Sequence, residues 1–378
     1  MLQKNSKLTR LSFILGSALL LFTLATKPLM LFDGIWHQWF SLSFFYFFYH
    51  YGFIFYIIGF GLLVYSLLLG SKKWLPLSLK LITILVFWLG VFLASPPYLN
   101  EAYQAISTEE SIDKEGIYAV VAGENSTHAY PAEQMMYYHV ISDAIEGENV
   151  LVTYCSMCRS FRTFSQKVNG KEFHFVTPYA YKKNSILEDK ETGSWWLQAT
   201  GECIYGELKG EKLDNWGKSL MMKGSVLADF SNVKLRNLKP NLNNEEINRL
   251  PDYKARLSSD YNQNQLWLKY NQKFYNIPLS SFSNEKPVIE LTISDSTNIT
   301  LMRLDEYSYL GFKSAYNAVL KLTSVYNQPV IIDTENRRWR ISGEPVNNHL
   351  PLELIEIAVE KPFAIQRFII PSIPPHMK

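Results

Sequence analysis

The chain has 378 residues and a net charge of +2, but its charges are unevenly distributed. Residues 1–97 contain seven Lys or Arg and a single acid, Asp33, whereas the remainder has 30 basic and 34 acidic residues, a net of −4. A mildly acidic C-terminal part argues against nucleic-acid binding, which usually needs a basic face. Three cysteines are too few for a disulfide scaffold.

Three apolar stretches predict transmembrane helices within residues 1–97, at about 11–26, 51–69 and 77–94. The second is long enough to cross a hydrocarbon core as a helix. The first follows three basic residues and is either an uncleaved anchor or a signal peptide. We expect the aromatic run 36–51 to extend the second span or to lie at the interface. Haem or quinone ligation by its two histidines is the alternative.

The basic residues predict an orientation for these spans. Lys4, Lys7 and Arg10 precede the first span, and Lys72 and Lys73 lie between the second and third. The positive-inside rule places both groups in the cytoplasm. We therefore expect an integral membrane protein with a cytoplasmic N-terminus and an extracytoplasmic C-terminal region, as in a bacterial inner membrane facing the periplasm. The lipid bilayer is then a partner, and nucleic acid is not.

The region from residue 98 onward contains many short apolar and β-branched runs separated by turn signals. Runs at 117–122, 149–154 and 161–168 predict strands, and Asn169-Gly170 predicts a hairpin turn. Residues 132–142 predict a helix. We expect an α+β fold that is mainly β. The predicted divisions are a domain at 98–238, a polar linker at 239–264 and a cysteine-free, strand-rich half at 265–378.

Residues 186–202 and 330–344 share a pattern of apolar run, acidic turn, Trp-containing strand and Gly-Glu. An internal repeat would explain this pattern and would make the exported region two related halves, of which only the first has the cysteine pair. A common hairpin type that arose twice by chance is the alternative.

The pair Cys155 and Cys158 is the most reactive feature of the chain, because it has C-x-x-C spacing at the end of a predicted strand. At this spacing one sulfur can resolve a mixed disulfide formed by the other. Arg159 is adjacent, and positive charge favours the thiolate. The leading hypothesis is therefore thiol–disulfide chemistry on an extracytoplasmic protein or a small thiol. It requires a sulfur that solvent can reach.

Two alternatives for the same cysteines stay open. Soft sulfur ligands favour Cu(I), so Cys155 and Cys158 with Met157 and His139 are candidate copper ligands. A fixed disulfide without turnover is the second alternative. The third cysteine, Cys203, is expected to be a small buried apolar residue.

The chain contains a series of motifs over about residues 115–220. They are His128-Ala129-Tyr130-Pro131, His139-x-x-x-Asp143, Val152-Thr153-Tyr154-Cys155-Ser156-Met157-Cys158, Phe161–Phe164, Gly170-Lys171-x-Phe173-x-Phe175, Asp189-Lys190-Glu191-Thr192-Gly193-Ser194-Trp195-Trp196, Gly201-Glu202 and 206–213. In this order and register they resemble domain-of-unknown-function family 3179.

The resemblance implies a chemical role for the cysteine pair, although it implies no particular activity. Members of the family usually have Cys-Pro-Leu-Cys, and some have selenocysteine at this motif, which favours redox or soft-metal chemistry over an inert disulfide. Here Ser156-Met157 replaces Pro-Leu, and Ser142-Asp143 replaces Asn-Asp. We expect a thiol–disulfide oxidoreductase in which Cys155 attacks, Cys158 resolves and Arg159 assists.

Overall fold

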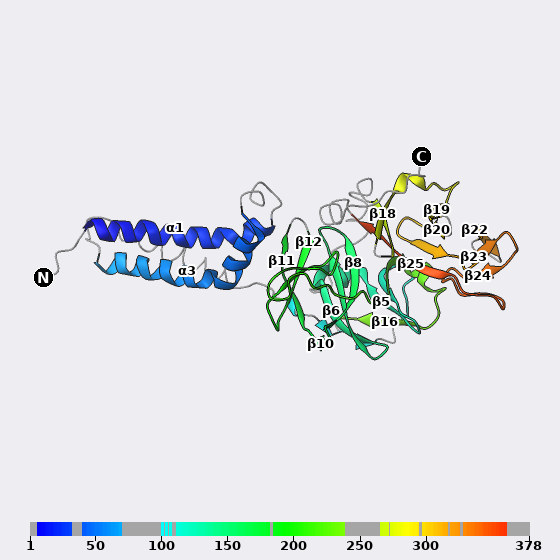
Figure 1. Ribbon diagram of the computed structural model, residues 1–378, viewed down its shortest axis with the longest axis horizontal. Helices are drawn as coiled ribbons and strands as arrows, with labels where there is room; N and C mark the ends of the chain where they lie inside the picture. The colour runs from blue at the N-terminus through cyan, green and yellow to red at the C-terminus, as the bar shows by residue number, and fades with distance from the viewer. Residues whose placement is uncertain are drawn as a thin grey trace.

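The protein has two long helices that run side by side and project from a mainly β body (Figure 1). The computed structural model describes residues 6–31, 40–69, 100–101, 103–104, 106–107, 111–181, 184–238, 265–271, 273–294, 297–316, 318–325 and 328–360. The predicted combination of N-terminal helices and a strand-rich region is confirmed.

The helices are α1 (Ser6–Leu31) and α3 (Leu42–Leu69), which pack as an antiparallel pair. Their backbones approach closely at two glycines, since a Cβ added to Gly16 would lie 2.8 Å from the Gly59 carbonyl oxygen. Small residues permit such contacts between membrane helices. Within the described residues, Leu42–Ser66 is the helical stretch long and apolar enough to cross a membrane.

The predicted spans fit these helices in part. The stretch 11–26 lies inside α1 and 51–69 lies inside α3. Residues 42–51 belong to α3 as well, so most of the aromatic run extends the second helix. The predicted span 77–94 lies outside the described residues.

The β body begins with two sheets that contain the cysteine pair and part of the residues that carry the family resemblance. One has the order β15-β4-β5-β16-β3. The other has the order β2-β6-β7-β8. Their strands are β15 (Lys218–Lys223), β4 (Ile117–Ala122), β5 (Thr127–Pro131), β16 (Val233–Asn237), β3 (Ile106–Ser107), β2 (Tyr103–Gln104), β6 (Val140–Ile145), β7 (Glu148–Cys155) and β8 (Ser160–Ser165).

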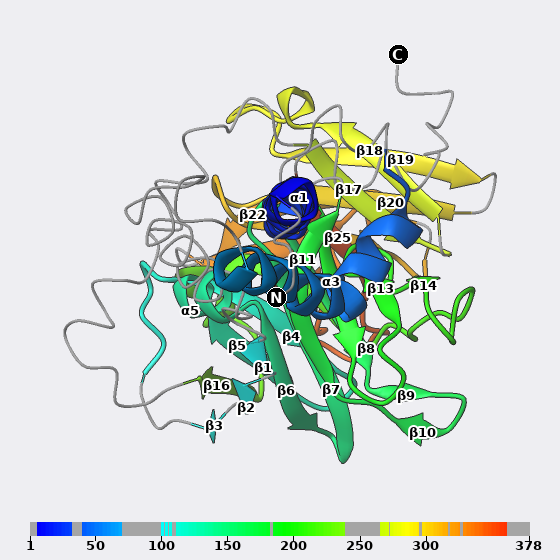
Figure 2. The ribbon, with the colours of Figure 1, turned by 90° about the vertical axis from the view of Figure 1, so that its left-hand side faces the viewer.

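A third sheet has the order β1-β11-β12-β13-β14 and lies at the end of the helix pair, so that β11 is behind the helices in the view along them (Figure 2). A two-stranded hairpin and two short helices complete this part of the chain. These elements are β1 (Asn100–Glu101), β11 (Phe175–Tyr181), β12 (Asn184–Asp189), β13 (Trp195–Leu197), β14 (Cys203–Tyr205), β9 (Lys167–Val168), β10 (Lys171–Glu172), α5 (Ala132–Tyr138) and α6 (Gly224–Leu227).

The remaining strands form a six-stranded sheet, β18-β17-β25-β21-β20-β19, and a three-stranded sheet, β22-β23-β24. The body includes a sheet curved into a half-barrel. The elements are β17 (Gln265–Tyr270), β18 (Lys273–Pro278), the 3-10 helix η2 (Leu279–Ser281), β19 (Val288–Ser294), β20 (Thr297–Arg303), β21 (Tyr309–Lys313), β22 (Leu320–Val325), β23 (Gln328–Asp333), β24 (Arg338–Trp339) and β25 (Glu353–Glu360).

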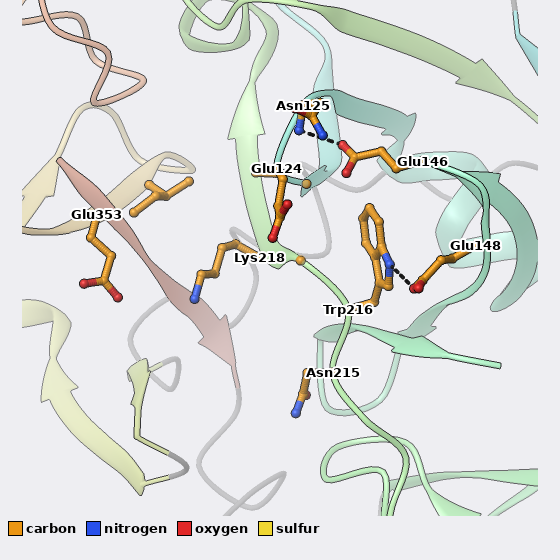
Figure 3. Close-up of a pocket in the computed structure, with 12 residues that line it drawn as sticks. Glu124, Asn125, Glu146, Glu148, Asn215, Trp216, Lys218 and Glu353 are labelled. Carbon is orange, nitrogen blue, oxygen red and sulfur yellow. Dashed lines mark hydrogen bonds between the residues drawn. The ribbon is translucent and has the colours of Figure 1, made fainter. Parts of the chain in front are cut away.

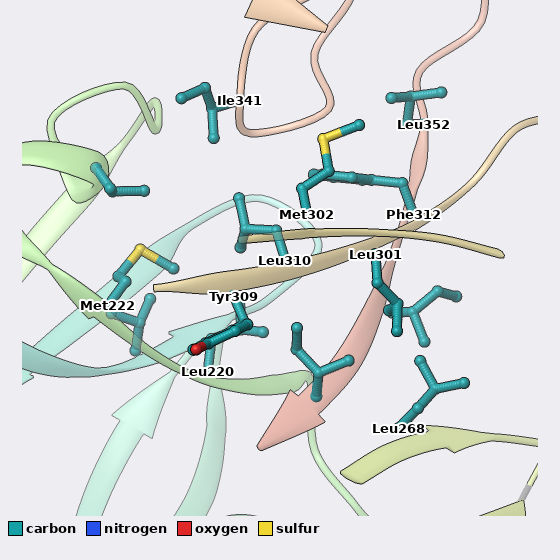
Figure 4. Packing of buried hydrophobic residues seen from close by; sticks show 14 of the residues in the cluster. Leu220, Met222, Leu268, Leu301, Met302, Tyr309, Leu310, Phe312, Ile341 and Leu352 are labelled. Carbon is teal, nitrogen blue, oxygen red and sulfur yellow. The ribbon is translucent and has the colours of Figure 1, made fainter. Parts of the chain in front are cut away.

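The largest hydrophobic cluster joins the two predicted strand-rich regions. Leu220 and Met222 of β15 pack with Leu268, Leu301 and Leu310 from the six-stranded sheet (Figure 4). Non-directional apolar burial of this kind is the main favourable term in folding. Residues 111–238 and the strands after residue 264 therefore share a core.

Local sequence signals located several of these elements. The predicted strand 117–122 matches β4, and Asn169-Gly170 turns between β9 and β10 with φ of 50° and 77°. Both residues at positive φ are typical of a tight hairpin turn. The predicted helix 132–142 is too long, because α5 ends at Tyr138 and His139 has φ 63°. The apolar residues that follow it belong to β6.

An aromatic and acidic contact joins α3 to the β body. Trp195 of β13 is fully buried, and its indole Nε1 donates a 2.7 Å hydrogen bond to Glu188 Oε2. The Tyr46 ring lies 5.1 Å from the Trp195 ring, and His50 Nε2 lies 3.8 Å from the same Glu188 oxygen. Burial raises the pKa of Glu188 to about 7, against the lowering effect of the Trp195 hydrogen bond.

This contact predicts a pH dependence for the stability of the full-length protein in detergent. Because the pKa of Glu188 is raised on folding, its protonated form contributes stability below the ordinary value of 4.5, and that stability is lost as the pH rises through about 7. We expect thermal unfolding to show that the free energy of unfolding falls by about 1–3 kcal/mol between pH 5 and 8. Glu188→Gln should flatten the curve.

Glu285→Gln, which changes an exposed carboxylate, is the matched control and should keep the wild-type pH dependence. A Glu188→Gln curve that falls as steeply as that of the wild type would contradict this assignment.

Candidate functional site

The cysteine pair lies where β7 turns into β8. Cys155 is the last residue of β7 and pairs in register with Ser160, the first residue of β8. Residues 156–159 form the tight turn between them, and Cys155 and Cys158 form a disulfide with a Cα–Cα distance of 5.6 Å. The β-branched run before Cys155 makes the strand, and the hairpin brings the two sulfurs together.

Both cysteines are 0% exposed, so neither sulfur is reachable in this state of the protein. The strand residues on either side, Tyr154 and Phe161, are buried in a hydrophobic cluster. Within the turn, Met157 is 36% exposed. The expectation of a solvent-accessible sulfur is therefore wrong for this conformation.

Each sulfur nevertheless has a polar neighbour. The backbone N–H of Cys158 donates a hydrogen bond to Cys155 Sγ, with an N–S distance of 3.3 Å. Cys158 Sγ lies 3.2 Å from the Ser160 hydroxyl oxygen. The N–H would stabilise negative charge on Cys155 after reduction, which is what an attacking sulfur needs.

A buried polar network connects Ser160 to Gln198, the residue directly after β13, and to Thr153 of β7. Ser160 Oγ donates a 2.5 Å hydrogen bond to Gln198 Oε1. Gln198 Nε2 donates to Thr153 Oγ1 at 3.0 Å and to the Ser160 carbonyl oxygen at 3.1 Å. Ser160, Thr153 and Gln198 are all 0% exposed. The sulfurs therefore border a satisfied polar network inside the protein.

Sequence reasoning missed Ser160 and Gln198. Ser160 has no distinguishing sequence signal, because it follows the C-x-x-C motif as an ordinary strand residue. Gln198 lies 40 residues beyond Cys158, and only the pairing of sheets brings it there. A usable signal was a lone amide directly after the apolar run Trp195-Trp196-Leu197, since a polar residue that continues a buried strand needs a partner.

Arg159 lies in the turn, as the sequence requires, but it is 7% exposed and has φ 58°. A non-glycine residue at positive φ is uncommon and is enriched at functional sites. The neighbouring cation Arg162 is also buried, and its Nε donates to the Ala199 carbonyl oxygen at 3.2 Å. Its guanidinium therefore ties β8 to the segment that follows β13.

The residues of the copper alternative are only partly brought together. His139 Nδ1 lies 3.3 Å from the Tyr154 carbonyl oxygen, next to Cys155 in sequence, and Met157 is in the turn. Within the part of the chain that the structure describes, no group of three or more His, Cys, Asp and Glu side chains is arranged to hold a metal ion. Copper binding stays a prediction.

Cys203 is 1% exposed and packs in a hydrophobic cluster with Trp196 and Leu213. Burial raises the pKa of its thiol to about 12. The expectation of a small buried apolar residue is confirmed, and the side chain is unsuited to exchange because exchange needs the thiolate.

A separate cavity of about 730 Å³ opens between β4, the segment before β15, and β25 (Figure 3). Its lining includes four carboxylates, and Trp216 Nε1 donates a 2.9 Å hydrogen bond to Glu148 Oε2. The lining residues are Ala122, Gly123, Glu124, Asn125, Glu146, Glu148, Asn215, Trp216, Gly217, Lys218, Glu353 and Leu354. Hence none of the sequence-predicted site residues lines it.

The motif residues His128, Tyr130 and Asp143 meet in one buried cluster. Tyr130 donates a 2.6 Å hydrogen bond to Asp143 Oδ2, and Arg236 binds both oxygens of the same carboxylate. His128 Nδ1 lies 3.6 Å from Asp143 Oδ2. The cluster joins β5 and β16 of one sheet to β6 of the next, so these motif residues hold the fold together.

Many of the motif residues that suggested a family lie in this cluster, in the cysteine hairpin and in the strand with Trp195-Trp196. Residues 96–368 match the family described as protein of unknown function (DUF3179). The chain belongs to this family. The match extends beyond residues 115–220 and includes both strand-rich regions of this DUF3179 protein. No curated protein and no solved structure matches the chain.

The Asp143 cluster predicts a large effect of Asp143→Asn on stability. Burial raises the pKa of Asp143, but contacts with His128, Arg236 and Tyr130 outweigh burial and lower it. The carboxylate therefore contributes stability above its unfolded value of about 3.9, and that stability is lost as the pH falls through the folded pKa. Urea unfolding of the full-length protein at pH 7 should show that Asp143→Asn lowers the free energy of unfolding by about 3–5 kcal/mol.

The difference between Asp143→Asn and the wild type should narrow in acid, where the wild-type carboxylate also becomes neutral. Glu285→Gln serves as the exposed control and should unfold like the wild type. A loss below about 1 kcal/mol at pH 7 would show that the cluster does not hold the sheets together.

Proposed function

We propose that this protein is a membrane-anchored, extracytoplasmic thiol–disulfide oxidoreductase that uses Cys155 and Cys158. The observation that supports this most directly is the N–H of Cys158 donated to Cys155 Sγ, because it would stabilise the thiolate of the attacking residue. The Cys158 sulfur, which has the Ser160 hydroxyl as its neighbour, would be the resolving residue.

The proposed exchange transfers two electrons between the cysteine pair and a partner dithiol. A partner thiolate attacks Cys155 Sγ, the Sγ–Sγ bond breaks, and its electron pair leaves on Cys158 Sγ, which takes a proton. The second partner thiol then attacks the mixed disulfide and releases Cys155 reduced, while the partner becomes a disulfide. A second, disulfide-bearing partner would reverse these steps and reoxidise the pair.

The exchange requires the turn at residues 156–159 to open, since both sulfurs are inaccessible. Four residues would have to move, and the hydrogen-bonded hairpin on either side could stay paired. Opening of a short turn without global unfolding is an ordinary event in folded proteins. Exchange would then be limited by the opening equilibrium.

Complete burial favours a second candidate, a fixed structural disulfide. Such a disulfide would contribute little to stability, because closing a loop of only four residues lowers the entropy of the unfolded chain by the equivalent of only about 2 kcal/mol in free energy. The paired strands already hold Cys155 opposite Ser160. Copper binding by the reduced pair with His139 and Met157 is the third candidate.

The proposed topology agrees with how the helices meet the body. The body contacts the end of the helix pair where α3 begins, through Phe45 and Tyr46. Lys7 and Arg10 lie at the start of α1, at the opposite end of the pair (Figure 1). With these basic residues in the cytoplasm, the body would lie outside.

We also propose that the exported region consists of two related halves. In the two segments with the shared pattern, the residue after the strand Trp donates its N–H to the carbonyl oxygen of the Gly-Glu glutamate. These pairs are Leu197 with Glu202, at 2.9 Å, and Arg340 with Glu344, at 2.8 Å. A common ancestry of the two hairpins would explain the agreement.

The proposed function predicts how the full-length protein in detergent responds to glutathione buffers. The fraction of reduced pair is measured by acid quenching, unfolding and maleimide labelling. We expect the Cys155–Cys158 couple to titrate well above about −300 mV, the region of structural disulfides. Cys158→Ser should accumulate a mixed disulfide on Cys155, whereas Cys155→Ser should accumulate none on Cys158.

Cys203→Ser is the control and should titrate like the wild type. A pair that is reduced only after unfolding would refute the exchange function and support a fixed disulfide. Stoichiometric Cu(I) retention by the folded, reduced protein, without thiol exchange, would support the copper alternative instead.

A further inference from the structure

We propose that Ser160, oriented by Gln198, acts as a hydrogen-bond acceptor that stabilises the reduced form of the Cys155–Cys158 pair. The inference rests on the proposed exchange function for its biological meaning. It identifies one residue that touches a reacting sulfur and one positioning residue behind it. Its physical basis is the direction of the hydrogen bonds in the buried network.

The orientation of the Gln198 amide is fixed by its acceptors. Gln198 Nε2 lies 3.1 Å from the Ser160 carbonyl oxygen and 3.5 Å from that of Thr153. Carbonyl oxygens only accept hydrogen bonds, so the group facing them must be the NH₂. The other end of the amide, Oε1, therefore faces the Ser160 hydroxyl.

Thr153 agrees with this direction. Its hydroxyl donates to the Arg162 carbonyl oxygen at 3.0 Å, so its oxygen is left to accept from Gln198 Nε2 at 3.0 Å. Each polar group donates to the next, and the chain ends on a backbone carbonyl. The network has one consistent direction, from Ser160 through Gln198 and Thr153 to Arg162.

In this network the single hydroxyl hydrogen of Ser160 is donated to Gln198 and is not available to a second acceptor. A serine hydroxyl has one hydrogen to donate and two lone pairs. The hydrogen points to Gln198 Oε1, at an oxygen–oxygen distance of 2.5 Å. Ser160 Oγ therefore presents a lone pair to Cys158 Sγ, 3.2 Å away.

The two redox states meet this lone pair differently. In the disulfide, Cys158 Sγ has no hydrogen, so two acceptors face each other in a region where Cys158 and Ser160 are both 0% exposed. After reduction by a dithiol, the Sγ–Sγ electron pair on Cys158 takes a proton, and the new S–H can donate to Ser160 Oγ. Cys155 Sγ still accepts the Cys158 N–H.

The reduced state thus gains a hydrogen bond that the oxidised state lacks. In a buried site such a bond is stronger than in water, and the oriented chain behind it adds to its strength. The expected consequence is an equilibrium shifted toward reduction, so that the pair is more oxidising than the same turn without Ser160.

The test compares equilibrium constants for reduction by glutathione in the full-length protein in detergent. Ser160→Ala should shift the equilibrium about five- to tenfold toward the disulfide, where tenfold corresponds to about 30 mV. Gln198→Met should shift it in the same direction, and Ser160→Thr, which keeps the hydroxyl, should restore it. Thr163→Val removes a buried hydroxyl from the same strand and should change it less than about twofold.

A shift toward the dithiol in Ser160→Ala would overturn the inference, because it would mean that the hydroxyl donates to sulfur. No shift would overturn it as well. If the wild-type pair never equilibrates with glutathione, the exchange function fails, and an infrared measurement still tests the hydrogen bond. In Cys155→Ser/Cys203→Ser protein the Cys158 S–H band should rise in frequency when Ser160 becomes Ala, and an unchanged band would refute the bond.

Discussion

The antiparallel pairing of β7 with β8 is the constraint on which the candidate site depends. It places Cys155 opposite Ser160, which sets the four-residue turn and brings Cys158 back to the first sulfur. The same pairing positions Thr153 opposite Arg162, where the hydroxyl of one meets the carbonyl of the other. A one-residue slip would reverse the faces of both strands and separate the sulfurs from their polar neighbours.

The surroundings of this hairpin give the site its chemical character. Gln198, in the turn that follows β13 of another sheet, directs the Ser160 hydroxyl, and the fully buried position keeps water from substituting for either group. Farther away, the Asp143 cluster joins neighbouring sheets, and Glu188 with Trp195 meets helix α3. The polar side chains therefore hold the body together, while the cysteine turn is the segment for which we propose redox chemistry.

The sequence predicted what local signals can specify. β-branched runs located β4 and β7, Asn169-Gly170 located a turn, and the spacing of Cys155 and Cys158 located the disulfide. It could not predict burial of both sulfurs, because that depends on contacts between separate sheets. Gln198 was missed for the same reason. Helix α5 was predicted too long because the apolar run after it continues as a strand.

The most direct test of the account is the labelling rate of Cys155 by a maleimide in the reduced, folded protein. It should be compared with the global unfolding rate of the same sample, obtained from amide hydrogen exchange in the core of β7. We predict that Cys155 reacts much faster than the whole protein unfolds, because only the turn at 156–159 has to open. Labelling that keeps pace with global unfolding would contradict the account and leave the cysteine pair as a fixed part of the core.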